Sequence, residues 1–125
     1  RLYLYRAGNL LQLTADHTQA WQKWKRGELT EYAYRNHPRR SALYDALGGG
    51  HPRISPQIES LPLEDGDRLL LCSDGIIDGL WERTIATELG HETDPARLAP
   101  RMLKRARKSS RADDATLIVA QIAQL

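Results

Sequence analysis

The sequence predicts an α+β domain built on antiparallel strands. Its first apolar runs, residues 2–6 and 10–13, are separated by only a short turn, as in a β-hairpin. Longer runs over residues 68–73 and after Asp114 do not alternate with polar residues, which predicts strands that are buried on both faces. Helical patterns occur between these groups of strands. Because the connections are hairpin-like, this order favours α+β over a doubly wound parallel sheet.

The N-terminal elements have clear local signals. Gly8 and Asn9, between the first two strands, are residue types that supply the positive φ of a tight hairpin turn. Thr18 is a suitable N-cap for a helix over residues 19–26. Gly27 is expected to end that helix.

The middle of the chain has weaker signals. Residues 28–40 are polar and aromatic with no clear period, which predicts a loop or lid with short helical turns. Residues 41–47 predict a short helical piece. Residues 54–63 alternate weakly and predict a strand interrupted by Pro56.

The last third is predicted to be mainly helical before the final strand. Residues 76–89 indicate one or two helices. Asp94 followed by Pro95 is a typical helix start, an N-cap with proline at the first helical position. The helix is expected to reach about Lys108, with Pro100 kinking or restarting it.

Composition excludes several classes of protein. Hydrophobic residues make up 41% and charged residues 27%, as in a soluble globular domain, and no apolar run approaches the ~20 residues of a membrane span. A net charge of +2 does not indicate nucleic-acid binding. The single cysteine forms no internal disulfide, so we expect a cytoplasmic protein. Arg1 is expected to lie inside a longer natural chain.

Two aspartates stand at the ends of predicted strands. Asp74 directly follows residues 68–73, and Asp113 lies just before the last strand. If these strands are antiparallel neighbours, both carboxylates lie at the same end of one sheet. Carboxylates that converge in a partly buried place repel, unless they share a proton or bind a cation such as Mg²⁺ or Mn²⁺. The other interpretation of this spacing is that Asp74 caps a helix while Asp113 and Asp114 form a turn.

Other catalytic patterns are missing. A phosphatase nucleophile at Cys72 requires an arginine six positions later, where the sequence has Asp78, so Cys72 is interpreted as a small buried hydrophobe. The histidines have no zinc-like spacing. A basic run is interpreted as the solvated face of a helix: Arg101, Lys104, Arg105, Arg107, Lys108 and Arg111.

Taken together, four motifs resemble the metal-dependent (type 2C, PPM-type) serine/threonine protein phosphatases, especially bacterial ones. They occur in the family's order and are RLYLYRAGNLLQLTADHT, HPRRSALYDALGG, LEDGDRLLLCSDGIID and ADDATLIVAQI. The resemblance implies an α+β fold, part of a four-layer α-β-β-α sandwich with antiparallel sheets. It also implies hydrolysis of phosphoserine or phosphothreonine by a metal-activated water, with no catalytic side chain as nucleophile.

The resemblance assigns roles to particular residues. Asp74 and Asp113 match metal ligands for Mn²⁺ or Mg²⁺, of which the complete domain holds two or three. Asp114 stands where the family usually has asparagine, as a possible ligand or a nearby charge. Residues 27–40 match a flap beside the active site, so Arg39 and Arg40 are candidates to meet a substrate phosphate.

The resemblance covers only the C-terminal half of that domain. We therefore expect residues 1–125 to lack the N-terminal half and its metal ligands, and to be inactive alone. The missing half is expected in cis, as a second chain or through a domain-swapped dimer, and the substrate is expected to be a phosphoprotein of a signalling pathway. The alternatives are a non-catalytic pseudophosphatase, a regulatory binding module, or a structural domain with a basic surface. No nucleic acid or membrane partner is expected.

Overall fold

The fold is described from a computed structural model, which describes residues 1–48 and 54–123. The chain divides into two compact units. Unit 1 consists of Arg1–Thr14 and Leu61–Leu125, and unit 2 of Ala15–Ser60. Among the described residues, no helix has the length and apolar character needed to cross a membrane.

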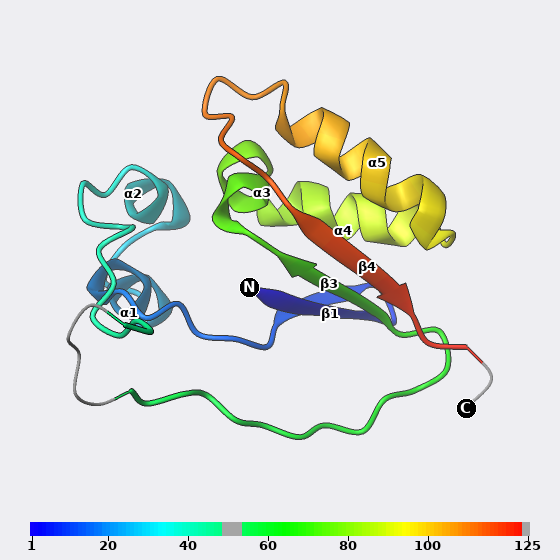
Figure 1. Cartoon of the computed structure of the whole chain (residues 1–125), viewed down its shortest axis with the longest axis horizontal. Coiled ribbons are helices and arrows are strands. Elements are labelled where there is room, and N and C mark those ends of the chain that lie inside the picture. The colour runs from blue at the N-terminus through cyan, green and yellow to red at the C-terminus, as the bar shows by residue number, and fades with distance from the viewer. Residues whose placement is uncertain (49–53, 124–125) are drawn as a thin grey trace. The chain divides into compact units, whose positions relative to one another are not determined.

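Unit 1 is a four-stranded antiparallel sheet with helices on one face, which confirms the α+β prediction (Figure 1). The strand order is β2-β1-β3-β4, and every neighbouring pair is antiparallel. The strands are β1 (Leu2–Arg6), β2 (Asn9–Gln12), β3 (Arg68–Cys72) and β4 (Leu117–Gln121). The helices are α3 (Asp74–Gly79), α4 (Glu82–His91) and α5 (Pro95–Ala106).

The core lies between the sheet and these helices. Tyr3 of β1 and Leu70 of β3 are paired and fully buried on the face of the sheet that the helices cover. Successive side chains of a strand point to opposite faces, so their neighbours along each strand point away from these helices. Helical residues spaced by three or four, such as Leu98 and Met102 in α5, meet the buried strand residues from the other side. Ile85 and Leu89 of α4 complete the same cluster.

The opposite face of the sheet is exposed along part of β3 and β4, although Leu4 of β1 on the same face is buried. This corrects the prediction that β3 and β4 are buried on both faces. Leu71 in β3 is 49% exposed, and Ile118, its partner in β4, is 60% exposed. Leu2 pairs with Leu71 from the other side, so one apolar row crosses β1, β3 and β4. The absence of alternation was a correct sign of two apolar faces. Among the described residues, helices cover one of these faces, and the other is left open at Leu71 and Ile118.

The hairpin turn differs from the prediction by one residue. Ala7 and Gly8 are the two central residues, with φ of 48° and 83°, as in a type I′ turn. Asn9 is instead the first residue of β2 and pairs with Arg6. Two-residue turns of this type match the right-handed twist of the strands, which is why Ala7 adopts a positive φ that a non-glycine residue rarely has.

Helix signals were reliable in both units. The Asp94 carboxylate accepts from the Ala96 N–H at 2.9 Å, and Pro95 is the first residue of α5. That helix continues through Pro100 without restarting and ends at Ala106 rather than Lys108. Residues 76–89 fall in two helices, α3 and α4, as the sequence allowed.

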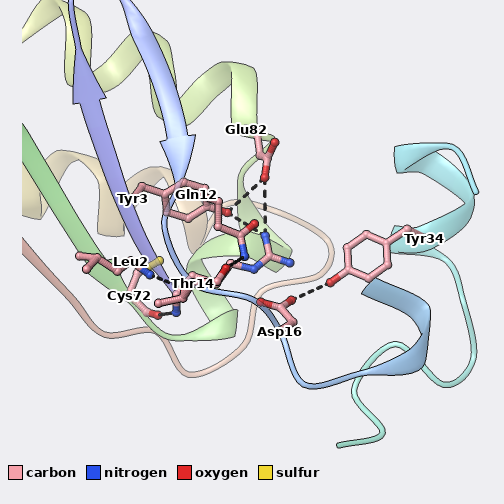
Figure 2. Close-up of polar contacts among 9 residues, drawn as sticks. Leu2, Tyr3, Gln12, Thr14, Asp16, Tyr34, Cys72 and Glu82 are labelled. Atoms are coloured by element: carbon pink, nitrogen blue, oxygen red, sulfur yellow. Dashed lines mark hydrogen bonds and ion pairs between the residues drawn. The ribbon is translucent and has the colours of Figure 1, made fainter. Parts of the chain in front are cut away.

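Unit 2 contains two short helices, α1 (Gln19–Lys25) and α2 (Glu31–Arg35). The Thr18 hydroxyl accepts from the Trp21 N–H at 3.1 Å, which confirms the predicted cap, and Gly27 has a φ of 77° after the helix end. The Tyr34 hydroxyl donates to the Asp16 carboxylate at 2.9 Å and ties α2 to the segment before α1 (Figure 2).

Two predicted elements of the middle region are wrong. Residues 41–47 do not form a helix, because Leu43 makes an isolated β-bridge with Thr18 and the Tyr44 N–H donates to the His17 carbonyl at 2.9 Å. Residues 54–63 do not form a strand. A strand requires a neighbour for its backbone groups, and no other described strand lies beside this segment, in which Ile58 is 85% exposed.

Candidate functional site

The end of β3 is joined directly to the beginning of β4. The Ser73 N–H donates to the Thr116 carbonyl at 2.9 Å, and the Thr116 N–H donates back to the Ser73 hydroxyl at 3.0 Å. Asp74 is the next residue after Ser73, and Asp113 lies just before the segment that leads into β4. The two strands are therefore antiparallel neighbours, as the sequence argument required. Asp74 lies just after the end of β3 and Asp113 lies before the start of β4, so both acids are at the same end of the sheet.

Gly75 brings the backbone of Asp114 to the start of α3. A Cβ atom on Gly75 would lie 2.3 Å from the Asp114 carbonyl oxygen and 3.1 Å from the Ala115 Cα. Real Cβ atoms do not approach other atoms so closely, so only glycine fits while the two segments keep this separation. The close approach fixes the Asp113–Asp114 segment against the residue that follows Asp74.

The three acids of this region are exposed, which corrects the expectation of a partly buried site. Asp74 is the first residue of α3 and Ser73 is its N-cap, so Asp74 is not the cap itself. One carboxylate oxygen of Asp113 accepts from the Asp114 N–H at 2.8 Å. Within residues 1–48 and 54–123, the carboxylates of Asp74 and Asp114 have no hydrogen bond or ion pair. They are open to a ligand.

A polar network that the sequence did not predict holds the same end of the sheet (Figure 2). Arg1 and Cys72 exchange backbone hydrogen bonds of 2.8 and 2.9 Å, which extends the β1–β3 pairing to the last residue of β3. The Arg1 guanidinium donates to the Tyr3 hydroxyl at 2.7 Å, and that hydroxyl donates to Glu82 at 3.3 Å. Burial raises the pKa of Tyr3 far above its usual range. Arg1 and Tyr3 are far in sequence from Cys72 and Glu82, so no local pattern predicts that they meet.

The predicted flap residues lie in unit 2. Arg39 is exposed and lines a hollow of about 160 Å³ together with Gln19, Ala42, Leu43 and Tyr44. Arg40 is half-buried and its N–H donates to the His37 carbonyl at 3.1 Å. Their role toward a phosphate stays a prediction.

Two residues that the sequence set aside, Cys72 and His17, have ordinary structural surroundings. Cys72 is a free thiol that is buried in the core, beside Leu70 and Ile76 in the same cluster. His17 lies 3.6 Å from the Asp45 carboxylate and stacks on Tyr44. No group of three or more His, Cys, Asp or Glu side chains that could hold a metal occurs among the described residues. Within residues 1–48 and 54–123, the acids at the sheet end therefore do not form a cluster of three potential ligands.

Comparison with known proteins identifies the fold. A family model described as Stage II sporulation protein E (SpoIIE) matches residues 31–123. The serine/threonine protein phosphatase PstP of Mycobacterium tuberculosis is 34% identical over 122 residues, which are 98% of this chain and 23% of PstP. The crystal structure of that phosphatase superimposes with a TM-score of 0.85 at 34% identity, over 99% of this chain and 52% of the solved one.

A second solved structure is the catalytic domain of PstP in complex with two manganese ions. It has a TM-score of 0.79 at 31% identity, over 99% of this chain and 50% of that domain. The chain thus spans about half the length of the solved phosphatase domains that it matches, and a smaller share of PstP itself. On the family match and the shared fold, the chain belongs to the SpoIIE family of PPM-type (type 2C) bacterial serine/threonine phosphatase domains.

Proposed function

We propose that this chain is the C-terminal half of a phosphatase domain that removes phosphate from serine and threonine residues of proteins. The observation that carries the proposal is the joining of β3 to β4 beside Asp74 and Asp113. Two hydrogen bonds and the Gly75 contact hold these acids at one sheet end, and the Asp74 carboxylate is free of partners in the described structure.

The chemistry of these residues fits part of a Mn²⁺ or Mg²⁺ site. Carboxylate oxygens are the ligands that such hard cations prefer. Asp74 and Asp113 would hold the ion, and Asp114 would add negative charge or replace Asp113 as ligand. When bound, the ion supplies an activated water and neutralises charge on the phosphoryl oxygens. The two manganese ions of the PstP catalytic domain support this choice of metal.

Two or three carboxylates do not complete such a site, and the remaining ligands are proposed to come from a complementary N-terminal half. The apolar row of Leu2, Leu71 and Ile118 supports this, because Leu71 and Ile118 are exposed and an apolar sheet face is normally buried against another layer. A second sheet on this face would give the four-layer α-β-β-α sandwich. The half would be supplied in cis, as a second chain or by domain swapping.

The substrate side of the proposal rests on unit 2. We assign residues 27–40 to a flap, with Arg39 and Arg40 as the side chains that meet the substrate phosphate. Arginine suits this role because its guanidinium donates two parallel hydrogen bonds to phosphate oxygens. We place this activity in the cytoplasm, in opposition to a protein kinase. The single, buried cysteine is compatible with a reducing compartment.

Phosphatase assays with a phosphothreonine peptide and Mn²⁺ test the proposal. The chain alone is expected to show no turnover, and the chain with a complementary half is expected to be active. In that complex, Asp74→Asn should lower the rate at least ~100-fold, since even outer partners of metal ligands are worth 10–100-fold. Asp113→Asn and Asp114→Asn identify which of the two neighbours is the ligand.

Asp65→Asn is the matched control, because Asp65 is also an exposed aspartate but precedes the opposite end of β3. It should leave the rate within about twofold of the parent. Robust turnover by the chain alone, abolished by Asp74→Asn, would show that the complementary half is not needed. A complex that binds Mn²⁺ and phosphopeptide without turnover would instead indicate a non-catalytic binding module.

A further inference from the structure

A basic hollow lies between α4 and α5, on residues to which the phosphatase proposal gives no role. It has a volume of about 400 Å³ and is lined by Glu88 from α4 and by Arg101, Lys104, Arg105 and Lys108 from α5 and its C-terminal extension. Figure 1 shows these two helices as neighbours on one side of the sheet. The buried residues of α5, Leu98, Met102 and Ala106, face the core, so the basic side chains occupy the outer part of this helix.

Glu88 holds the two arginines of this hollow in place. Its side chain is only 8% exposed, and its two oxygens accept from Arg101 Nε and Arg105 Nη1, each at 2.6 Å. A buried carboxylate must be compensated, and two guanidinium groups do so here. Each guanidinium has five N–H donors, and the side chains of Arg101 and Arg105 are 45% and 54% exposed. Arg101 Nη2 also donates to the Glu88 carbonyl at 3.4 Å, and both guanidinium groups have more donors than these contacts use.

The lysines of the hollow are unpaired. Within the described residues, Lys104 and Lys108 are exposed and have no ion pair or hydrogen bond from their side chains. Four cations therefore face one carboxylate, and that carboxylate is already shared by two of them. The hollow carries an excess of positive charge with ordered donors, which is suited to an anionic ligand.

The spacing of these cations fits an extended peptide. Arg101 and Arg105 are four residues apart in one row, and Lys104 and Lys108 in a second, which corresponds to ~6 Å along a helix. Alternate side chains of an extended chain are separated by ~6.6 Å on one face. A segment with an acid at every second position would thus meet successive cations of one row. DNA requires a broader basic surface, and the net charge of this chain is only +2.

We infer that this hollow, formed by Glu88, Arg101, Lys104, Arg105 and Lys108, binds an acidic, extended segment of a partner protein. The guanidinium groups fixed by Glu88 provide directed hydrogen bonds to carboxylates, and the lysines provide additional attraction. The inference does not depend on catalysis by this domain. A failure of the phosphatase assay would leave it untouched, and a failure of binding would leave the phosphatase proposal untouched.

Binding is measured by fluorescence anisotropy with a labelled peptide of alternating glutamate and serine, using the chain and its complex with a complementary half. We expect binding that weakens as salt is raised, because exposed charges are screened over ~10 Å at 0.1 M salt. Lys104→Gln with Lys108→Gln should weaken binding about tenfold, as expected for the loss of two rim charges. Circular dichroism checks that this variant is folded.

The matched control removes two other exposed charges, one in α4 and one at the C-cap of α5, in the double variant Arg83→Gln with Arg107→Gln. Neither arginine lines the hollow, so peptide affinity should stay within about twofold of the parent. Equal loss in both double variants would overturn the inference, since it would reflect overall charge alone. Absent peptide binding would also overturn it, as would tighter binding of a single-stranded oligonucleotide. Competition by inorganic phosphate at concentrations as low as those of the peptide would overturn the choice of a peptide ligand.

Discussion

Gly75 is the residue at which fold and candidate site can be tested by one substitution. In Gly75→Ala, the new Cβ would stand 2.3 Å from the Asp114 carbonyl oxygen and 2.9 Å from its carbon. Both atoms belong to the backbone, so α3 and the 113–115 segment must separate. Overpacking of this kind costs ~1–3 kcal/mol. An approach of 2.3 Å to a backbone atom belongs to the upper part of that range, ~2–3 kcal/mol, and alanine in a helix regains up to ~1 kcal/mol relative to glycine, so the net loss is ~1–2 kcal/mol.

Gly90→Ala is a matched control for this substitution. Gly90 also lies in a helix, and its added Cβ would meet the Tyr5 hydroxyl at 2.6 Å, the far end of a side chain that can rotate away. We expect Gly90→Ala to change the free energy of unfolding by less than ~1 kcal/mol, because the helix propensity of alanine offsets the contact. Urea unfolding of both variants measures the difference.

The same pair of variants reports on the candidate site. If Gly75→Ala separates the 113–115 segment from α3, Mn²⁺-dependent activity of the complemented domain should fall more than stability alone explains. Activity is therefore measured at a temperature where both variants remain folded. A Gly75→Ala protein as stable as the parent would refute the reasoning, because the backbone contact would then be easily relieved. Equal stability of the two variants would refute it as well.

Three further predictions concern stability. Arg6 donates to both oxygens of Asp67 at 2.7 and 2.6 Å and holds the pKa of Asp67 at about 2. This pKa lies below the ~3.9 of an unfolded aspartate, so the stabilisation is present above pH ~4 and is lost as the pH falls toward ~2. Asp67→Asn should remove this part of the acid dependence of the urea midpoint. Leu98→Ala, at a fully buried position of α5, should lower the unfolding free energy by ~2–5 kcal/mol in the same assay, and a smaller loss would show that the core closes around the gap. Thr18→Ala should destabilise α1 by ~1 kcal/mol, seen as faster amide hydrogen exchange of Trp21, and unchanged exchange would contradict the capping role.

Most of unit 1 could be predicted because its signals are local. The hairpin, the Asp94 cap with Pro95, and the apolar runs of β3 and β4 each specify an element within a few residues. The antiparallel pairing of β3 with β4 was the condition under which Asp74 and Asp113 would lie at one sheet end, and the structure meets it. What the sequence could not show were contacts between distant residues, such as the Glu88 ion pairs with Arg101 and Arg105. Those depend on how α4 and α5 pack.

Two of the wrong predictions share a physical cause. Residues 54–63 have a weak strand pattern but no neighbouring strand, and the outer faces of β3 and β4 are apolar but uncovered in the described structure. In the first case the missing element is a neighbouring strand, and in the second it is a layer that covers the apolar face. Neither occurs among the described residues. The acids at the sheet end repeat this pattern, since their ligand chemistry is suitable and their number is too small. If the proposed complementary half supplies the missing layer and ligands, its addition should bury Leu71, protect the amides of residues 54–63 from exchange and allow Mn²⁺ binding in the same step.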